Sequence, residues 1–231
     1  LLTNKGFSAI AWLFRHAVIM DFSGCAQFGN TALYHVTENC RAVTNLNLSG
    51  WDMITDVGVK RISSRCQKLE TLNLSVNSDS PGCRSVGNKS LSALLGRLRL
   101  LRTLELQNRV LITGTTQPSG PAFRAKMLRH VNFAGCTDLR LTSVRSIVAE
   151  CPEITMLELT RCRIASKRKR SAIKELIHLL PHPELMEAVF GRTFCGLRCV
   201  PYYGLRRCQL HFHERFELEH ASALKLQVRW R

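Results

Sequence analysis

The chain has 231 residues, of which 45% are hydrophobic and 22% are charged, and its formal net charge at pH 7 is +16. This balance is typical of a folded globular protein and excludes wholesale disorder. No stretch approaches the roughly 18 consecutive apolar residues of a membrane span, so we expect no membrane contact of that kind. The chain begins with Leu1 rather than Met, which is consistent with a fragment. It lacks a signal-peptide pattern, and we therefore expect a cytoplasmic or nuclear location.

A short pattern, apolar-x-x-apolar-x-apolar, recurs along the chain and predicts a strand at each copy. In CRAVTNLNLSG it is carried by Val43, Leu46 and Leu48. The central apolar residues of six successive copies are Met20, Leu46, Leu72, Leu104, Val131 and Leu157. Their intervals are 26, 26, 32, 27 and 26 residues, which indicates an internal repeat. Leu185, Ala188 and Phe190 form a degraded seventh copy.

A second periodic segment precedes most of these strands and predicts a helix. Val59, Ile62 and Cys66 illustrate its i, i+3, i+7 spacing, which marks one face of a helix. Each helix is expected to begin near a residue that favours N-caps, namely Thr3, Asn30, Thr55, Asn88 or Thr142.

Two segments depart from the repeat. Residues 75–89 are an insertion rich in Ser, Pro, Gly and Asn, and residues 111–121 are rich in Thr, Gly and Pro. The second composition predicts a loop where neighbouring units have a helix. A tolerated surface insertion and a binding loop are both compatible with these segments.

Neither the strand nor the helix of one unit can bury its apolar side alone, whereas stacked units can. Intervals near 26 residues with Leu-x-x-Leu-x-Leu are typical of leucine-rich repeats. We therefore predict an α/β fold, a leucine-rich-repeat solenoid with a curved parallel sheet inside and helices outside. Residues 1–190 form the repeats, with six clear units and a degraded seventh, and residues 191–231 form an irregular C-terminal cap or tail.

The unit that starts at Cys40 resembles the cysteine-containing class of leucine-rich repeats. The class pattern is Cys-x-x-Leu-x-x-Leu-x-Leu-x-x-Cys/Trp followed by Ile-Thr-Asp-x-Gly, and here it runs through Trp51 to Gly58. Residues 151–162 are a second good match. F-box/LRR proteins are the commonest owners of this repeat, and in them the F-box binds a ubiquitin-ligase adaptor while the repeats bind the target. The resemblance implies a protein target and ubiquitin-ligase subunits as partners. The chain itself shows no F-box pattern, because the nearest candidate, residues 183–190, reads better as a repeat.

Most of the ten cysteines occupy fixed positions in the repeat. Cys40, Cys66 and Cys151 each stand six residues before a strand's central apolar residue. Such placement predicts small buried residues with reduced thiols, and disulfides are the alternative.

The C-terminal segment departs from the repeat. Residues 166–170 are a basic run, and further on stand four residues of types that zinc accepts, Cys195, Cys199, Cys208 and His211. Their spacing fits no standard zinc finger, and a cap with free thiols is the simpler explanation, so we predict no metal and no cofactor. The segment nonetheless supports an alternative function, a basic and zinc-assisted nucleic-acid-binding module in residues 163–231.

On the strands, the residues beside the buried ones point away from the helices and line the inner face. The candidate partner-binding residues on this face are Asp21, Asn45, Asn47, Thr71, Asn73, Thr103, Glu105, His130, Asn132, Met156 and Glu158. None is Lys or Arg, although the chain is strongly basic. A nucleic-acid groove would be lined with cations, so this face favours a polypeptide, in particular a basic one. Alternatively, these are only solvated strand residues, with Asn favoured by the repeat itself.

No nucleophile with a nearby base and no phosphate-binding loop stands out, so we expect no enzyme activity. The sequence predicts non-catalytic protein–protein recognition by the concave face. The resemblance extends this to the substrate-recognition part of an SCF-type ubiquitin ligase. A scaffold subunit of a cytoskeletal or ciliary assembly is a further alternative, and nucleic acid is expected only at the basic tail.

Overall fold

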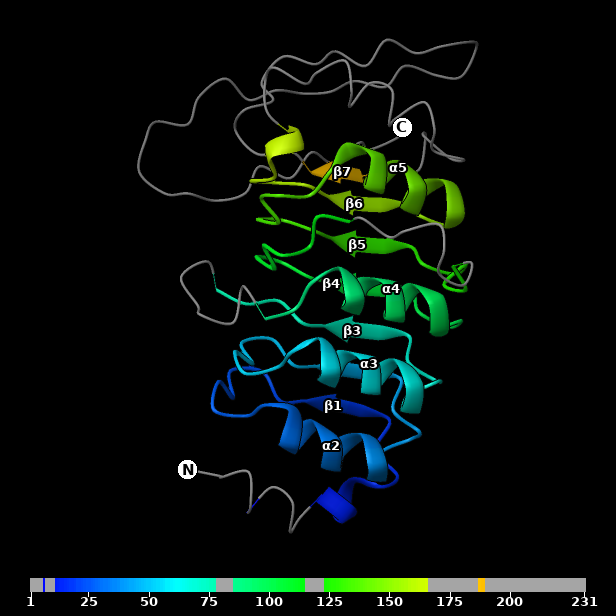
Figure 1. The fold of residues 1–231 in the computed structure, drawn as a ribbon. Coiled ribbons are helices and arrows are strands. Elements are labelled where there is room, and N and C mark those ends of the chain that lie inside the picture. Colours follow the sequence, from blue (N-terminus) through cyan, green and yellow to red (C-terminus); the bar gives the residue numbers. More distant parts are fainter. Residues whose placement is uncertain (1–5, 7–10, 78–84, 115–122, 166–186, 190–231) are drawn as a thin grey trace, which may run out of the picture.

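The computed structural model describes residues 6, 11–77, 85–114, 123–165 and 187–189. The repeats appear in it as short strands, most of which are followed by a ten-residue helix (Figure 1). In chain order the elements are η1 (Ala11–Phe14), β1 (Ile19–Asp21), α2 (Asn30–Asn39), β2 (Asn45–Asn47), α3 (Asp56–Arg65), β3 (Thr71–Asn73), α4 (Asn88–Arg97), β4 (Thr103–Glu105), β5 (His130–Asn132), α5 (Leu141–Glu150), β6 (Met156–Glu158), η3 (Arg163–Ala165) and β7 (Glu187–Val189). None of these helices has the length and apolarity needed to cross a lipid bilayer.

The seven strands form one parallel sheet in the order of the chain, β1 to β7. Their central residues pair from strand to strand in the series Met20, Leu46, Leu72, Leu104, Val131, Leu157 and Ala188. This register confirms the ladder predicted from the repeat. Ala188 occupies the seventh position, whereas Leu185 and Phe190 lie outside the described residues.

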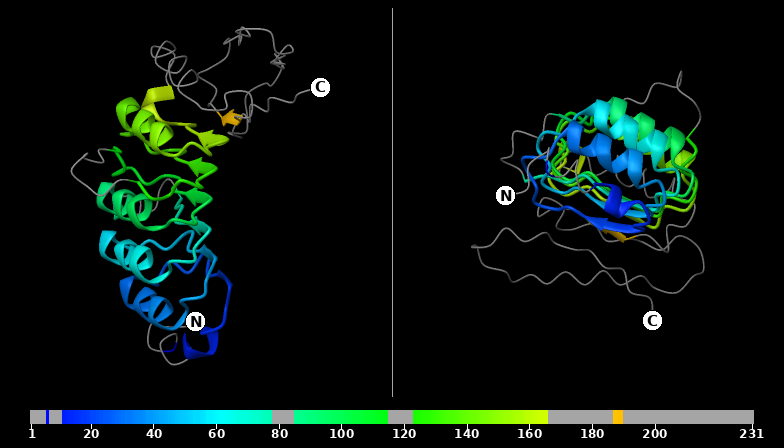
Figure 2. Two further views of the ribbon diagram at one scale, coloured as in Figure 1. Left: turned by 90° about the vertical axis from the view of Figure 1, so that its right-hand side faces the viewer. Right: turned by 90° about the horizontal axis from the view of Figure 1, so that it is seen from below.

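The helices lie together on one side of this sheet, and no element of the described residues covers the other side (Figure 2). Each helix buries its i, i+3 face against the strands, as α3 does with Val59 and Ile62, both 0% exposed. The central strand residues are buried on the same side, and one continuous apolar core runs through the stack. The protein is therefore a leucine-rich-repeat solenoid, as predicted.

The four described ten-residue helices begin within one residue of Asn30, Thr55, Asn88 and Thr142, as predicted, but only one of these residues is an N-cap. Thr55 caps α3, because its hydroxyl accepts a hydrogen bond from the Val57 N–H at 3.3 Å. Asn30 and Asn88, in contrast, are the first residues of α2 and α4 and are not their caps. The cap of α5 is Arg140, and Thr142 lies inside that helix, while Thr3 is outside the described residues.

Asn30 and Asn88 instead connect neighbouring units. Asn30 Nδ2 donates to Thr55 Oγ1 at 2.8 Å, and Asn30 Oδ1 accepts from the Thr55 N–H at 3.1 Å. Asn88 makes the same pair of bonds with Thr113, at 2.7 and 3.0 Å. A residue type that often caps a helix is thus used here to fix the register between successive units.

A turn of the same conformation follows strands β1, β2, β4, β5 and β6. Its left-handed position, with φ between +61° and +77°, is occupied by Gly24, Gly50, Asn108, Gly135 and Arg161. The residue after it donates to a carbonyl of the preceding unit. The four such bonds are Trp51 Nε1 to Phe22 O (2.6 Å), Arg109 Nε to Leu74 O (2.7 Å), Cys136 Sγ to Leu106 O (3.3 Å) and Cys162 Sγ to Phe133 O (3.0 Å). This series joins the units along the turn edge of the sheet.

The unit between β4 and β5 lacks a helix over its described residues, 106–114 and 123–129, in line with the predicted loop. Residues 115–122 and the inner part of the earlier insertion, 78–84, lie outside the described part of the chain.

The six cysteines within the described residues are free thiols, which confirms that prediction for them, and all but Cys25 are buried. Desolvation by burial raises the pKa of Cys40 to about 11 and the pKa of Cys66 to about 12. At pH 8 almost none of either side chain is therefore thiolate, which is the form that reacts with alkylating reagents.

We accordingly expect Cys40, Cys66, Cys136, Cys151 and Cys162 to react with iodoacetamide only after unfolding. Cys25 is half-buried and should react in the native protein. Mass spectrometry of the labelled peptides, with and without denaturant, measures each site. Native labelling of Cys66 at the rate found in denaturant would contradict its burial.

Candidate partner-binding face of the sheet

The structure brings all eleven predicted residues to the face of the sheet opposite the helices. On each of the strands β1–β6 the central side chain is buried and its two neighbours lie on the opposite side, as Asn45 and Asn47 do around Leu46. The parallel register then aligns these neighbours into two rows across β1–β6. We call the eleven residues together the sheet face.

The described strands that form the sheet face carry acidic but no basic side chains apart from His130. Asp21, Glu105 and Glu158 provide the negative charge. Arg102 and Arg129, which come just before β4 and β5, are paired with carboxylates. Arg102 Nε lies 3.3 Å from Glu70 Oε2, and Arg129 Nη2 lies 3.4 Å from Glu153 Oε2.

Several amide and carboxylate groups of the sheet face have a local structural role. In four strands the last side chain accepts a hydrogen bond from the backbone N–H two residues later, which closes the turn. The pairs are Asp21 with Ser23 (2.8 Å), Asn47 with Ser49 (3.1 Å), Asn73 with Ser75 (2.9 Å) and Asn132 with Ala134 (2.8 Å). Asn132 is also buried, at 8% exposure. These hydrogen bonds support the alternative that the repeat itself favours Asn at this position. Each of these side chains uses one oxygen lone pair for the turn, and its other polar atoms can still contact a partner.

The carboxylate of Asp21 is held in its charged form. The hydrogen bond from the backbone N–H of Ser23 is the main cause that lowers its pKa, with smaller contributions from the side chains of Ser23 and Asn47. Asn47 Nδ2 donates to Asp21 Oδ2 at 3.0 Å. Because the pKa is lowered on folding, these bonds stabilise the fold at neutral pH, and their contribution is lost as the pH falls through the folded-state pKa.

Glu105 and His130 form a pair in the middle of the sheet face. His130 Nδ1 lies 3.4 Å from Glu105 Oε1, and the two side chains are 29% and 20% exposed. The other ring nitrogen, Nε2, is buried and has no hydrogen-bond partner among the described residues. Thr103 and Met156 flank His130 on the adjacent strands, and Thr71 lies beside Thr103 on β3; all three side chains are half-buried.

The structure does not describe the alternative sites predicted in the tail. Cys195, Cys199, Cys208 and His211, the basic run 166–170 and the cap 191–231 all lie outside the described residues. Within the described ranges, no group of three or more His, Cys, Asp or Glu side chains is arranged to hold a metal ion.

Arg109 is a residue that the sequence analysis did not single out. It is 0% exposed, and besides its bond to Leu74 O, its Nη1 donates to Ser85 Oγ at 3.2 Å. Its place in the repeat, equivalent to Trp51 and Cys136, is the signal that identifies it as a structural residue.

No family model matches the chain. Among solved structures, the leucine-rich repeat-containing protein LegL7 from Legionella pneumophila matches with 16% identity and a TM-score of 0.43, covering 71% of this chain and 52% of that one. The yeast Rad7–Elc1 complex matches with 14% identity and a TM-score of 0.28, covering 82% and 73%. The C-terminal domain of Caenorhabditis elegans tropomodulin matches with 10% identity and a TM-score of 0.41, covering 76% and 92%. The chain thus spans about half the length of LegL7, and at these TM-scores the matches do not bear on what it binds.

Proposed function

We propose that this protein recognises another polypeptide, without catalysis, through the sheet face. The observation that supports the proposal is the charge of that face. Strands β1–β6 present amide, hydroxyl and carboxylate groups but no Lys or Arg, although the chain has a formal net charge of +16. A basic segment in extended form would meet Asp21, Glu105 and Glu158 along the rows and gain on-rate from the opposite charge.

The resemblance of residues 40–58 and 151–162 to the repeats of F-box/LRR proteins supports a more specific proposal. In that family the repeats select the protein that is to be ubiquitylated. We propose that the sheet face plays this target-binding part and that ligase subunits bind a different surface.

The test requires a variant that changes the sheet face without opening its turns. Asn73 is unsuitable because its Oδ1 accepts the hydrogen bond from the Ser75 N–H that closes the turn. Thr71→Arg with Thr103→Arg places two cations on adjacent strands, where they should repel a basic partner and exclude it sterically. We expect this variant to lose most partners that quantitative mass spectrometry detects with the wild type in affinity capture from cell extract.

The matched control places two cations on the helix side, at exposed positions of α5, as Ser146→Arg with Ala149→Arg. This variant has the same net charge and should retain the captured proteins. If both variants capture the same set as the wild type, the sheet face is not the recognition surface. Addition of ubiquitin and ligase components to the captured complex then tests the ligase part separately.

A further inference from the structure

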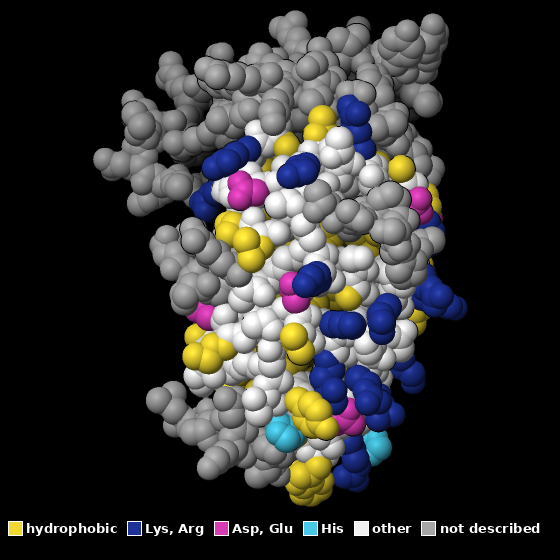
Figure 3. Space-filling view, viewed as in Figure 1, with side chains coloured by type: hydrophobic (Ala, Val, Ile, Leu, Met, Phe, Trp, Pro, Cys, Tyr) yellow, Lys and Arg dark blue, Asp and Glu magenta, His cyan; other side chains and the backbone are white. Residues whose placement is uncertain are grey.

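The helix side of the protein carries a basic surface that the proposed function does not use. Lys and Arg side chains gather over α3, α4 and the C-terminal end of α2 (Figure 3). The exposed cations in and just after these helices are Arg41, Lys60, Arg65, Lys68, Lys89, Arg97 and Arg99. Asp56, an acidic residue of this region, is already engaged, because its Oδ1 accepts from the Gly87 N–H at 2.9 Å and from the Ser90 N–H at 3.2 Å.

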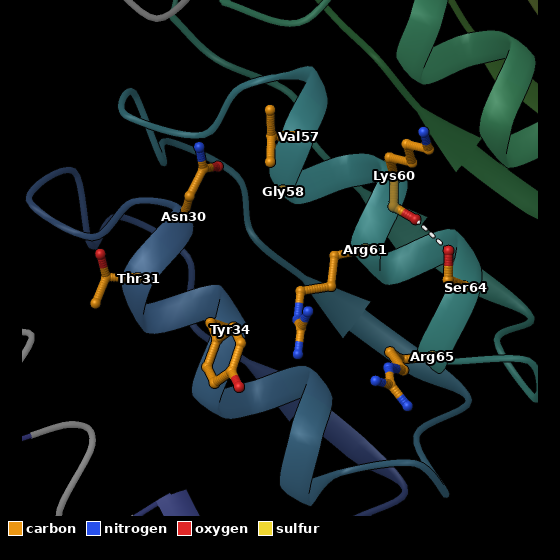
Figure 4. Close-up of a pocket in the computed structure, with 9 residues that line it drawn as sticks. All are labelled: Asn30, Thr31, Tyr34, Val57, Gly58, Lys60, Arg61, Ser64 and Arg65. Atoms are coloured by element: carbon orange, nitrogen blue, oxygen red, sulfur yellow. Dashed lines mark hydrogen bonds between the residues drawn. The ribbon is translucent and has the colours of Figure 1, made fainter.

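A groove of about 540 Å³ lies on this surface between α2 and α3. Tyr34 from α2 and Arg61 from α3 face each other in it (Figure 4), with Arg61 Cζ 3.9 Å from the centre of the Tyr34 ring. Lys60, Arg65 and Val57 also line the groove. We name these five residues the α2–α3 groove.

The arginines of this region already share one carboxylate of the protein. Glu38 contacts Arg61, Arg65 at 3.3 Å and Arg41 at 3.7 Å. One negative charge thus faces three guanidinium groups, and the Arg65 side chain remains 42% exposed. Because guanidinium groups pair well with planar carboxylates, the cluster can accept further carboxylates from outside.

Apolar side chains stand beside the cations. Val57 is 72% exposed and Tyr34 is 48% exposed, so both offer contact area to a partner. A phosphate backbone would gain nothing from Val57 and would be repelled by Glu38. An acidic peptide with interspersed apolar residues matches both the charges and the apolar area.

From the charge complementarity and this apolar edge, we propose that the α2–α3 groove docks an acidic amphipathic peptide segment of a partner protein. Carboxylates of the segment pair with Lys60 and Arg65, and its apolar side chains lie against Tyr34 and Val57. This surface is on the opposite side of the molecule from the sheet face and has the opposite charge, so the two can be occupied together.

The test uses the full chain and fluorescence anisotropy with a labelled amphipathic peptide of Glu, Leu and Ala. A peptide with every Glu replaced by Gln is expected to bind at least about tenfold more weakly. Lys60→Glu with Arg65→Glu should lower the affinity for the Glu-containing peptide by at least about tenfold. The control, Arg124→Glu with Arg140→Glu, makes the same charge change at exposed positions outside the groove and should alter this affinity less than about twofold. Circular dichroism checks that both variants are folded.

Two results would overturn the proposal. Equal weakening by the two variant pairs would mean that the peptide responds only to net charge. Tighter binding of a single-stranded oligonucleotide than of the peptide, abolished by the same groove variant, would assign the groove to nucleic acid instead. Neither result depends on the sheet face, since Thr71→Arg with Thr103→Arg should leave peptide binding at wild-type strength.

Discussion

Replacement of Trp51 by alanine is expected to lower the free energy of unfolding by about 3–5 kcal/mol. The indole is 0% exposed and packs against Phe28 and Phe22, with ring centroids 5.3 and 6.2 Å away. Its Nε1 also donates to Phe22 O at 2.6 Å, so truncation both leaves a cavity and removes this hydrogen bond. Urea unfolding followed by circular dichroism measures the change.

Trp51→Phe separates these two contributions. Phenylalanine retains much of the apolar volume and the aromatic contacts but removes the donor, and we expect a loss of about 1–2 kcal/mol. A loss for Trp51→Ala below about 1 kcal/mol would be typical of a surface site and would show that the indole does not fill the core between the first two units.

Gly135→Ala is expected to lower the free energy of unfolding by about 2–5 kcal/mol. At φ +74° an alanine adopts a left-handed conformation that costs roughly 1–2 kcal/mol. Its Cβ would in addition overlap Asn108 Oδ1. Asn108 cannot turn away without loss, because its Nδ2 donates to Val76 O at 2.7 Å, and such overpacking adds roughly 1–3 kcal/mol.

Gly24→Ala is the matched control, since Gly24 has nearly the same conformation, φ +76°, but no atom within 4 Å of the added Cβ. It should lose only the conformational part, roughly 1–2 kcal/mol. The same urea unfolding measurement compares the two variants. If they are equally destabilised, the Asn108 side chain yields to the methyl group and the turns are less tightly coupled than the hydrogen bonds indicate.

The spacing of apolar residues was sufficient to predict the fold. A strand that repeats every 26 residues with one buried central residue leaves little freedom in register, and Leu46, Leu72 and Leu104 pair accordingly. The six-residue insertion before Leu104 did not disturb this register, because the extra residues extend a connection and not the strand.

Side-chain roles within the repeat were harder to predict. Asn30 and Asn88 have the residue type of an N-cap, and only the neighbouring unit, distant in sequence, determines that they bond to Thr55 and Thr113. Arg109 would ordinarily be assigned to the surface, since buried arginines are rare. Its burial follows from carbonyl groups that the sequence does not reveal.

For the candidate site, the sequence predicted which residues share a face but not how each is used. The period of two along a strand fixes the direction of Asn73 and Thr71 alike. That Asn73 closes a turn while Thr71 does not depends on the path of the chain after the strand. The repeat pattern specifies the fold of the solenoid, and it does not specify the chemistry of a partner.

The interruption of the helix layer between α4 and α5 affects how the protein unfolds. In the described residues, α2 packs against α3 and α3 against α4, while β4 and β5 are joined through the sheet and turns without a helix between α4 and α5. Cooperativity in a stack of repeats passes through contacts between neighbours, so it is weakest at this joint. The segments before and after it should therefore behave as two foldons, and the one containing α5 can open while the other remains native.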